Sequence, residues 1–145
     1  MPQELATTVA DEEAVMAGCT GSTGVYLIAR IRPDAETQGP AKRVAGMVVA
    51  RVGTLARMRH AAKLEVMVDP AHRRQGLGRA LMEGCIAWAE AAVGVEKLSL
   101  SVFADNEAAL ALYRDLGFEE EGRRLREYKD LDGAYRDDVL MHRWV

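Results

Sequence analysis

The segment VMVDPAHRRQGLGRAL, residues 66–81, decides the fold that this chain is predicted to have. It reads as an apolar strand, a polar turn, a basic loop with two glycines and the first turn of a helix. The glycines let the backbone approach a bulky group closely, and the start of the helix presents unpaired N–H groups with a partial positive charge. Full positive charge comes from Arg73, Arg74 and Arg79. The segment therefore predicts a cradle for a pyrophosphate group.

Two commoner glycine motifs fit this segment less well. A dinucleotide-binding fold needs a third glycine where Leu81 stands, and its glycines follow the strand almost at once, whereas residues 69–75 intervene here. A P-loop needs Gly-Lys-Ser/Thr, which does not follow. The spacing that remains is Arg73-x-x-Gly76-x-Gly78.

Composition predicts one ordinary globular domain over residues 1–145, because 49% of the residues are hydrophobic and 28% are charged. The net charge of −3 argues against a nucleic-acid partner. We expect no membrane association, because no apolar run approaches the about 18 residues that span a bilayer and no signal peptide is recognisable. With only Cys19 and Cys85, neither a disulfide framework nor a metal site is expected. These features predict a cytoplasmic protein.

Hydrophobic periodicity predicts strands that alternate with helices, and hence an α/β fold. Helical segments are expected over residues 3–17 and 75–92, and in a helix that starts at Asp105 or Asn106 and stops at Gly117. Strands are expected over residues 25–29, 44–55, 63–68, 98–102, 118–121 and 138–145, with a hairpin loop over 33–40, a basic turn over 56–62 and a tight hairpin at Asp132-Gly133.

A second motif, NEAALALYRDLGF at residues 106–118, follows the first by about thirty residues. It has an Asn at the start of a helix, a Tyr seven residues later and Gly-Phe where the helix stops. Together the two motifs resemble the signatures of the GNAT N-acetyltransferase superfamily, over the chain from Val44 to the C-terminus. The resemblance implies a mixed, mostly antiparallel central sheet, flanked by helices and splayed between its two central strands. The finer pattern is similar to the branch that acetylates small amines and amino acids, near the ribosomal-protein alanine acetyltransferases.

The resemblance also implies acetyl-CoA as the cofactor and indicates which residues hold it. Main-chain groups of Met67 and Val68 would bind the pantetheine arm and the thioester. The loop and helix start would hold the pyrophosphate, and the candidates are Arg73, Arg74, Gln75, Gly76, Leu77, Gly78 and Arg79. Asn106 either contacts the cofactor arm as well as capping its helix, or acts as a cap alone.

Tyr113 is the residue we expect to protonate the departing thiolate, although a tyrosine on an amphipathic helix can equally be a core residue. Glu65 is a weaker candidate for the base that deprotonates the amine, since it can also be an exposed charge on its strand. His60 titrates in a suitable range, but it can equally end a strand.

The predicted reaction is direct acetyl transfer to a primary amine of a small molecule, in a ternary complex without a metal. The alternatives are acetylation of a protein N-terminus and a CoA-binding sensor that has lost catalysis. Only 24 residues precede Val25, so we expect the family's first strand and part of its acceptor-side helices to be abbreviated. The amine pocket would then be partly open or completed by a second subunit of a homodimer.

Overall fold

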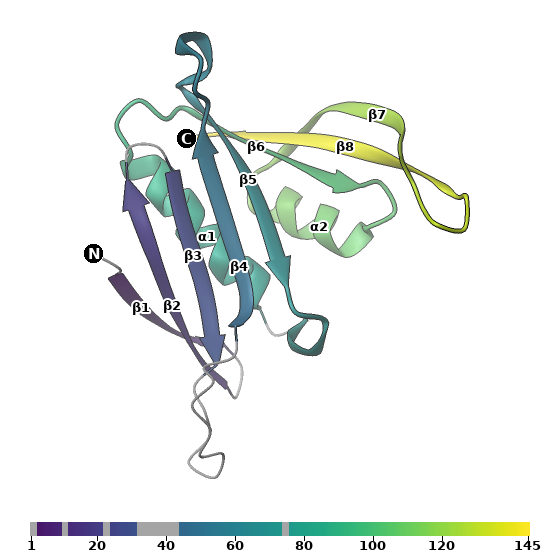
Figure 1. The fold of residues 1–145 in the computed structure, drawn as a ribbon. Helices are drawn as coiled ribbons and strands as arrows, with labels where there is room; N and C mark the ends of the chain where they lie inside the picture. The colour runs from purple at the N-terminus through teal and green to yellow at the C-terminus, as the bar shows by residue number, and fades with distance from the viewer. Residues whose placement is uncertain (1–2, 10–11, 22–23, 32–43, 74–75) are drawn as a thin grey trace.

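A computed structural model describes residues 3–9, 12–21, 24–31, 44–73 and 76–145. These residues form one eight-stranded sheet and two α-helices (Figure 1). The strands are β1 (Gln3–Val9), β2 (Glu12–Gly21), β3 (Gly24–Ile31), β4 (Val44–Val52), β5 (Ala61–Val68), β6 (Lys97–Phe103), β7 (Glu119–Lys129) and β8 (Tyr135–Trp144). The helices are α1 (Leu77–Ala91) and α2 (Glu107–Asp115), and short 3-10 turns occupy Ala56–Met58 and Pro70–His72.

The sheet has the strand order β1-β2-β3-β4-β5-β6-β8-β7. Every neighbouring pair is antiparallel except β5 and β6, which are parallel. The predicted mixed, mostly antiparallel sheet is therefore confirmed, and the one parallel pair lies between its N-terminal and C-terminal halves (Figure 1).

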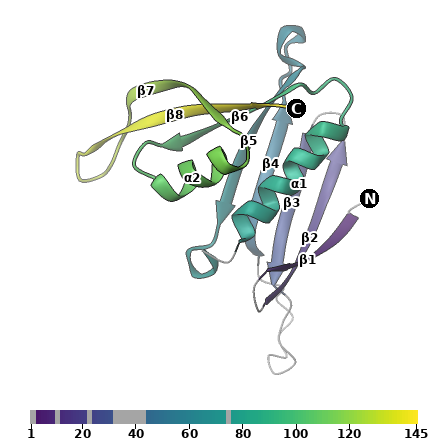
Figure 2. The same cartoon turned by 180° about the vertical axis from the view of Figure 1, so that it is seen from behind.

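Both helices cover the same face of the sheet, as the view from behind shows (Figure 2). Helix α1 packs on β3, β4 and β5, and its apolar stripe includes the fully buried Leu81, Cys85 and Ala89. Gly46 on β4 lets this helix approach, because a Cβ there would lie 3.1 Å from Cδ1 of Leu81. We call the opposite side of the sheet the free face. Neither described helix is long and apolar enough to cross a membrane.

The prediction of a helix over residues 3–17 is wrong, because β1 and β2 form an antiparallel pair there. Strand β2 also pairs with β3, from Ala14 opposite Ile31 to Gly21 opposite Gly24. Sheet pairing supplies main-chain hydrogen bonds that override a weak helical spacing, and the β-branched run Thr7-Thr8-Val9 already favoured a strand. Two strands, β1 and β2, therefore precede Val25 in the region that we expected to be abbreviated.

The strand predicted to end at Glu121 continues as β7 to Lys129, alongside β8. Its register shifts between Arg124 and Tyr128, where Arg126 has a positive φ of 51° and donates its N–H to Oδ1 of Asp137 at 2.8 Å. The tight turn at Gly133 is confirmed by a φ of 88°. The predicted loop over residues 33–40 lies outside the described residues.

Candidate active site

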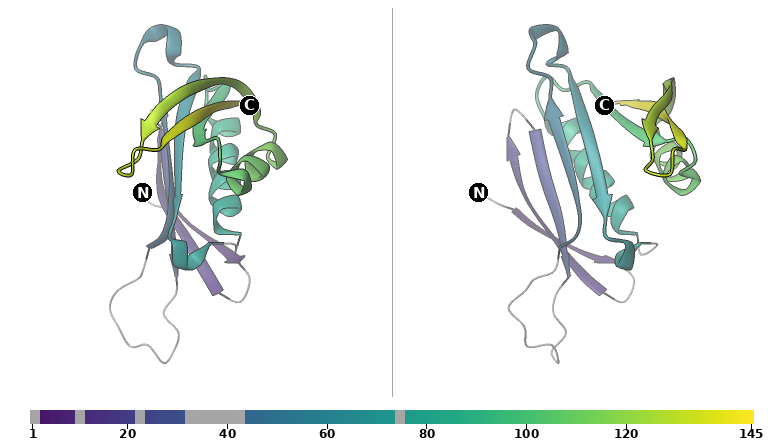
Figure 3. Two further views of the ribbon diagram at one scale, coloured as in Figure 1. Left: turned by 90° about the vertical axis from the view of Figure 1, so that its right-hand side faces the viewer. Right: turned by 45° about the vertical axis from the view of Figure 1, so that its right-hand side comes forward.

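Strands β5 and β6 separate soon after they meet. They pair only from Ala61 to Lys63 on β5, opposite residues 97–99 on β6, and the N–H of Lys97 donates to the carbonyl of His60 at 3.0 Å where they meet. Beyond this point, residues 64–68 of β5 and 100–103 of β6 face each other without strand pairing, and we call this region the β5–β6 opening (Figure 3). The expected splay between the two central strands is confirmed.

The register of β4 and β5 shows which main-chain groups face this opening. One hydrogen bond marks each end of the β4–β5 pairing. At one end the N–H of Asp69 donates to the carbonyl of Ala45 at 2.8 Å, and at the other the N–H of Gly53 donates to the carbonyl of Ala61 at 3.0 Å. Because hydrogen bonding alternates along an antiparallel pair, the N–H and C=O of Met67 point to β4. Those of Val68 point into the opening.

Val66 was missed by the sequence reasoning, and it presents its main-chain groups to the opening as Val68 does. Of the two residues predicted to hold the cofactor arm, Val68 therefore has the expected orientation, whereas the main chain of Met67 belongs to the β4 ladder. The sequence could not show which of Met67 and Val68 faces the opening, because this depends only on which residues of β5 form hydrogen bonds with β4.

The start of α1 lies at the wide end of the opening. Gly76 adopts a left-handed conformation with a φ of 80°, and no side chain caps the helix there. A Cβ on Gly78 would lie 3.6 Å from Cδ2 of Leu112 and 3.7 Å from Cγ2 of Val68. Thus α1, α2 and the end of β5 converge around the uncapped N–H groups of residues 77–79.

The arginines of the predicted cradle are placed differently from one another. Arg73 is exposed and donates from Nε to the carbonyl of Val68 at 3.4 Å. Arg79 forms an ion pair with Asp115 of α2 and lies 4.0 Å from Glu83, so it connects the two helices. The predicted residues Arg74 and Gln75 lie outside the described residues.

Tyr113 and Asn106 both lie in the second motif, which forms α2. Tyr113 is 7% exposed, and its ring centroid lies 6.2 Å from that of Phe118. Burial raises the pKa of its phenol, so the side chain is protonated and neutral at neutral pH. Asn106 caps the helix, because its Oδ1 accepts from the N–H of Ala109 at 3.2 Å, which confirms the cap.

The two candidate bases lie on β5 or at its start. Glu65 is exposed on the free face, beside the β5–β6 opening, and Met67 is 59% exposed on the same face. His60 is exposed where β5 begins, and its carbonyl accepts from the N–H groups of Glu96 and Lys97. The structure thus places Glu65 nearer than His60 to the opening.

The site offers binding and proton transfer, and Cys85 supplies no nucleophile. Burial raises the pKa of its thiol to about 12, so the thiolate is scarce at neutral pH. Within the described ranges, no group of three or more His, Cys, Asp or Glu side chains could hold a metal ion.

Acetyl-CoA fits the chemistry of this donor set. An uncapped helix start with a nearby arginine suits a pyrophosphate, and the unpaired strand edges suit an extended arm that carries amide groups. Gly78 leaves the space between Val68 and Leu112, beside this helix start, free of a side chain of its own.

Comparison with known proteins relates this chain to acetyltransferases. The model of the acetyltransferase (GNAT) family matches residues 9–118. The [ribosomal protein bS18]-alanine N-acetyltransferase of Escherichia coli (strain K12) is 42% identical over 96 residues, which cover 66% of this chain and 63% of that protein. The L-amino acid N-acetyltransferase AaaT of the same strain is 32% identical over 100 residues, covering 69% of this chain and 61% of that protein. The chain thus spans less than two thirds of the length of these relatives.

A solved structure shows the same fold. The crystal structure of the acetyltransferase of GNAT family from Streptococcus pneumoniae superposes with a TM-score of 0.75 at 28% identity, covering 87% of this chain and 70% of that chain. The family match extends over most of the sheet, both glycine positions of the cradle and the whole of α2. This chain belongs to the GNAT acetyltransferase family.

Proposed function

We propose that this chain transfers an acetyl group from acetyl-CoA to a primary amine of a small molecule, directly and in a ternary complex. Acetyl-CoA is the donor that GNAT acetyltransferases use. The observation that carries the proposal is the β5–β6 opening, where two strand edges are unpaired beside the uncapped start of α1. Bringing two substrates together there supplies much of the acceleration without a covalent enzyme intermediate.

The residues of the cradle and the opening have separate tasks in this proposal. Acetyl-CoA supplies a reactive thioester. The N–H groups that begin α1 bind the pyrophosphate, and Arg73 adds positive charge. The main-chain groups of Val66 and Val68 hold the arm and polarise the thioester carbonyl. The amine approaches from the free face.

Proton transfer involves both ends of the reaction. A free alkylamine has a pKa of about 10.4 and a thiol one of about 8.5, so at neutral pH the amine must lose a proton and the departing thiolate must gain one. Glu65 accepts the proton of the amine, directly or through a water molecule. Tyr113 donates a proton to the departing sulfur.

Thiol release with a panel of amines tests this proposal, together with calorimetry of CoA binding. We expect CoA uptake and thiol release that depends on a small primary amine. CoA binding without release on any amine would instead support the sensor function. Failure to bind CoA would contradict the assignment of the cradle itself.

A second candidate function is acetylation of a protein N-terminus. The similarity to the ribosomal-protein alanine N-acetyltransferase favours it, and so does the free face, which no helix of the described residues covers. A peptide that begins with alanine, compared with free alanine in the same assay, separates the two candidates.

We also expect the chain in the cytoplasm, and its mass in solution will test whether it forms a homodimer.

A further inference from the structure

Asp138 on β8 is a buried carboxylate that the proposed mechanism does not use. It is 2% exposed, and Oδ2 has no hydrogen-bond partner among the residues that the structure describes. A buried carboxylate oxygen without a partner is costly, which points to a group that the protein itself does not contain. A cation is the natural partner of such a group.

The carboxylate lies on the face from which the acceptor approaches. Asp138 is directly opposite Phe103 on β6, and Lys63 on β5 is opposite Ser99 on β6. Paired residues share a face, and so do residues two or four apart on one strand. Asp138 and Glu65 therefore both belong to the free face, toward which the β7–β8 hairpin curves (Figure 3).

Two aromatic rings form a roof over Asp138. The rings of Phe103 on β6 and Tyr128 on β7 meet edge to face, with centroids 5.1 Å apart. Because β8 lies between these strands, the rings must meet above β8, where Phe103 is opposite Asp138 and Tyr128 is opposite Arg136. Both rings are exposed, at 39% and 43%, and aromatic faces attract cations.

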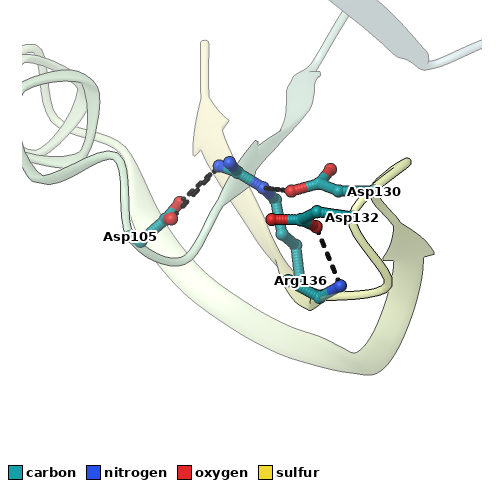
Figure 4. A network of polar contacts seen from close by, with 5 residues as sticks. Asp105, Asp130, Asp132 and Arg136 are labelled. Carbon is teal, nitrogen blue, oxygen red and sulfur yellow. Dashed lines mark hydrogen bonds and ion pairs between the residues drawn. The ribbon is translucent and has the colours of Figure 1, made fainter.

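Two arginines lie near Asp138, and both are paired with other carboxylates, Arg136 by hydrogen bonds and Arg124 by a longer ion pair. Arg136 stacks on Phe103, with Cζ 5.2 Å from the ring centroid, but its guanidinium donates to Asp130 at 2.7 Å and to Asp105 at 3.1 Å (Figure 4). Arg124, which is opposite Asp138 on β7, lies 3.9 Å from Glu127. The surroundings of Asp138 thus combine a carboxylate whose Oδ2 has no partner among the described residues with two aromatic rings, in a region rich in aspartates.

We propose that Asp138 binds a second cationic group of the acceptor, which makes an alkyl diamine the substrate class. This inference rests on the proposed acetyl transfer. The group cannot be the nitrogen that attacks the thioester, because β6 separates Asp138 from the β5–β6 opening by a strand spacing of about 5 Å. A diamine can place one nitrogen at the opening and the other beneath the Phe103–Tyr128 roof.

Steady-state acetylation of 1,4-diaminobutane and of butylamine tests this inference. We expect the wild-type protein to favour the diamine at least tenfold in kcat/KM. Asp138→Asn should remove this preference, mainly by raising the KM for the diamine, with a loss at least tenfold larger than for butylamine. Asp132→Asn is the matched control, because it removes the same charge from the tip of the same hairpin and should keep the preference.

A second variant, Phe103→Leu, removes one ring and keeps the carboxylate, and it should lower the diamine preference several-fold. It decides the question if Asp138→Asn does not fold. Acetylation of both amines with equal efficiency by the wild-type protein would overturn the diamine inference and leave the proposed acetyl transfer intact. An equal loss on both amines in Asp138→Asn would also overturn it, since the role of Asp138 would then be structural. Absence of thiol release with every amine would overturn both proposals.

Discussion

The two edges of strand β5 differ in how their main-chain groups are used. Toward β4 the strand forms seven residue pairs, whereas toward β6 it forms three. The paired edge holds the sheet together, and the unpaired edge leaves N–H and C=O groups available to a ligand. One strand can therefore be structural on one side and a binding surface on the other, and the assignment changes from each residue to the next.

We expect the largest loss of activity when the proposed proton donor of the site is removed. We expect Tyr113→Phe to lower kcat about 100-fold or more, because it removes the proton donor for the thiolate. The dissociation constant of CoA should remain the same, as measured by calorimetry. Tyr26→Phe, on β3, is the control and should retain activity. Unchanged turnover in Tyr113→Phe would make this tyrosine a packing residue.

Proline substitutions compare the two edges directly. Met67→Pro removes an N–H from the β4 ladder, whereas Val68→Pro removes one that faces the opening. Met67→Pro should lower the free energy of unfolding by about 1–3 kcal/mol more than Val68→Pro, in urea denaturation. Val68→Pro should in turn show the larger loss of CoA affinity per unit of lost stability. A larger loss of stability in Val68→Pro than in Met67→Pro would contradict the assignment of the Met67 N–H to the hydrogen bonds with β4.

Alanine substitutions at the two glycines of the cradle should have different effects, one on stability through backbone strain and the other on CoA binding. Gly76→Ala should cost about 1–2 kcal/mol of stability, because its φ of 80° is unfavourable for a residue with a Cβ. Gly78→Ala should leave stability unchanged or raise it by up to about 1 kcal/mol, since the contacts of the added methyl are ordinary. It should nevertheless weaken CoA binding. If Gly78→Ala binds CoA normally, the arm does not pass between Val68 and Leu112.

The smallest effects are expected at the arginines. Arg73→Gln should weaken CoA binding several-fold at low salt and less at high salt, because its charge is exposed and screened. Arg79→Gln should change CoA binding less, because that guanidinium already pairs with Asp115. Calorimetry of both variants at two salt concentrations measures the difference, and equal losses would show that Arg79 leaves Asp115 to bind the phosphates.

Local patterns predicted α1, α2 and most of the strands from β3 onward. Asn106 and Gly133 were correctly placed because a helix cap and a tight turn depend on a few neighbouring residues. The splay and the cofactor site came from resemblance to a family. The N-terminal strands were missed, because pairing with β3 decides their conformation.

The sequence by itself determined what short-range interactions specify, which is a glycine where the backbone of the cradle adopts a positive φ and a tyrosine in the helix of the second motif. Only the tertiary structure decided which edge of β5 is unpaired, since that depends on the phase of hydrogen bonds with β4. It also decided that Phe103 and Tyr128 meet over Asp138, because residues distant in the chain become neighbours only when β8 lies between β6 and β7.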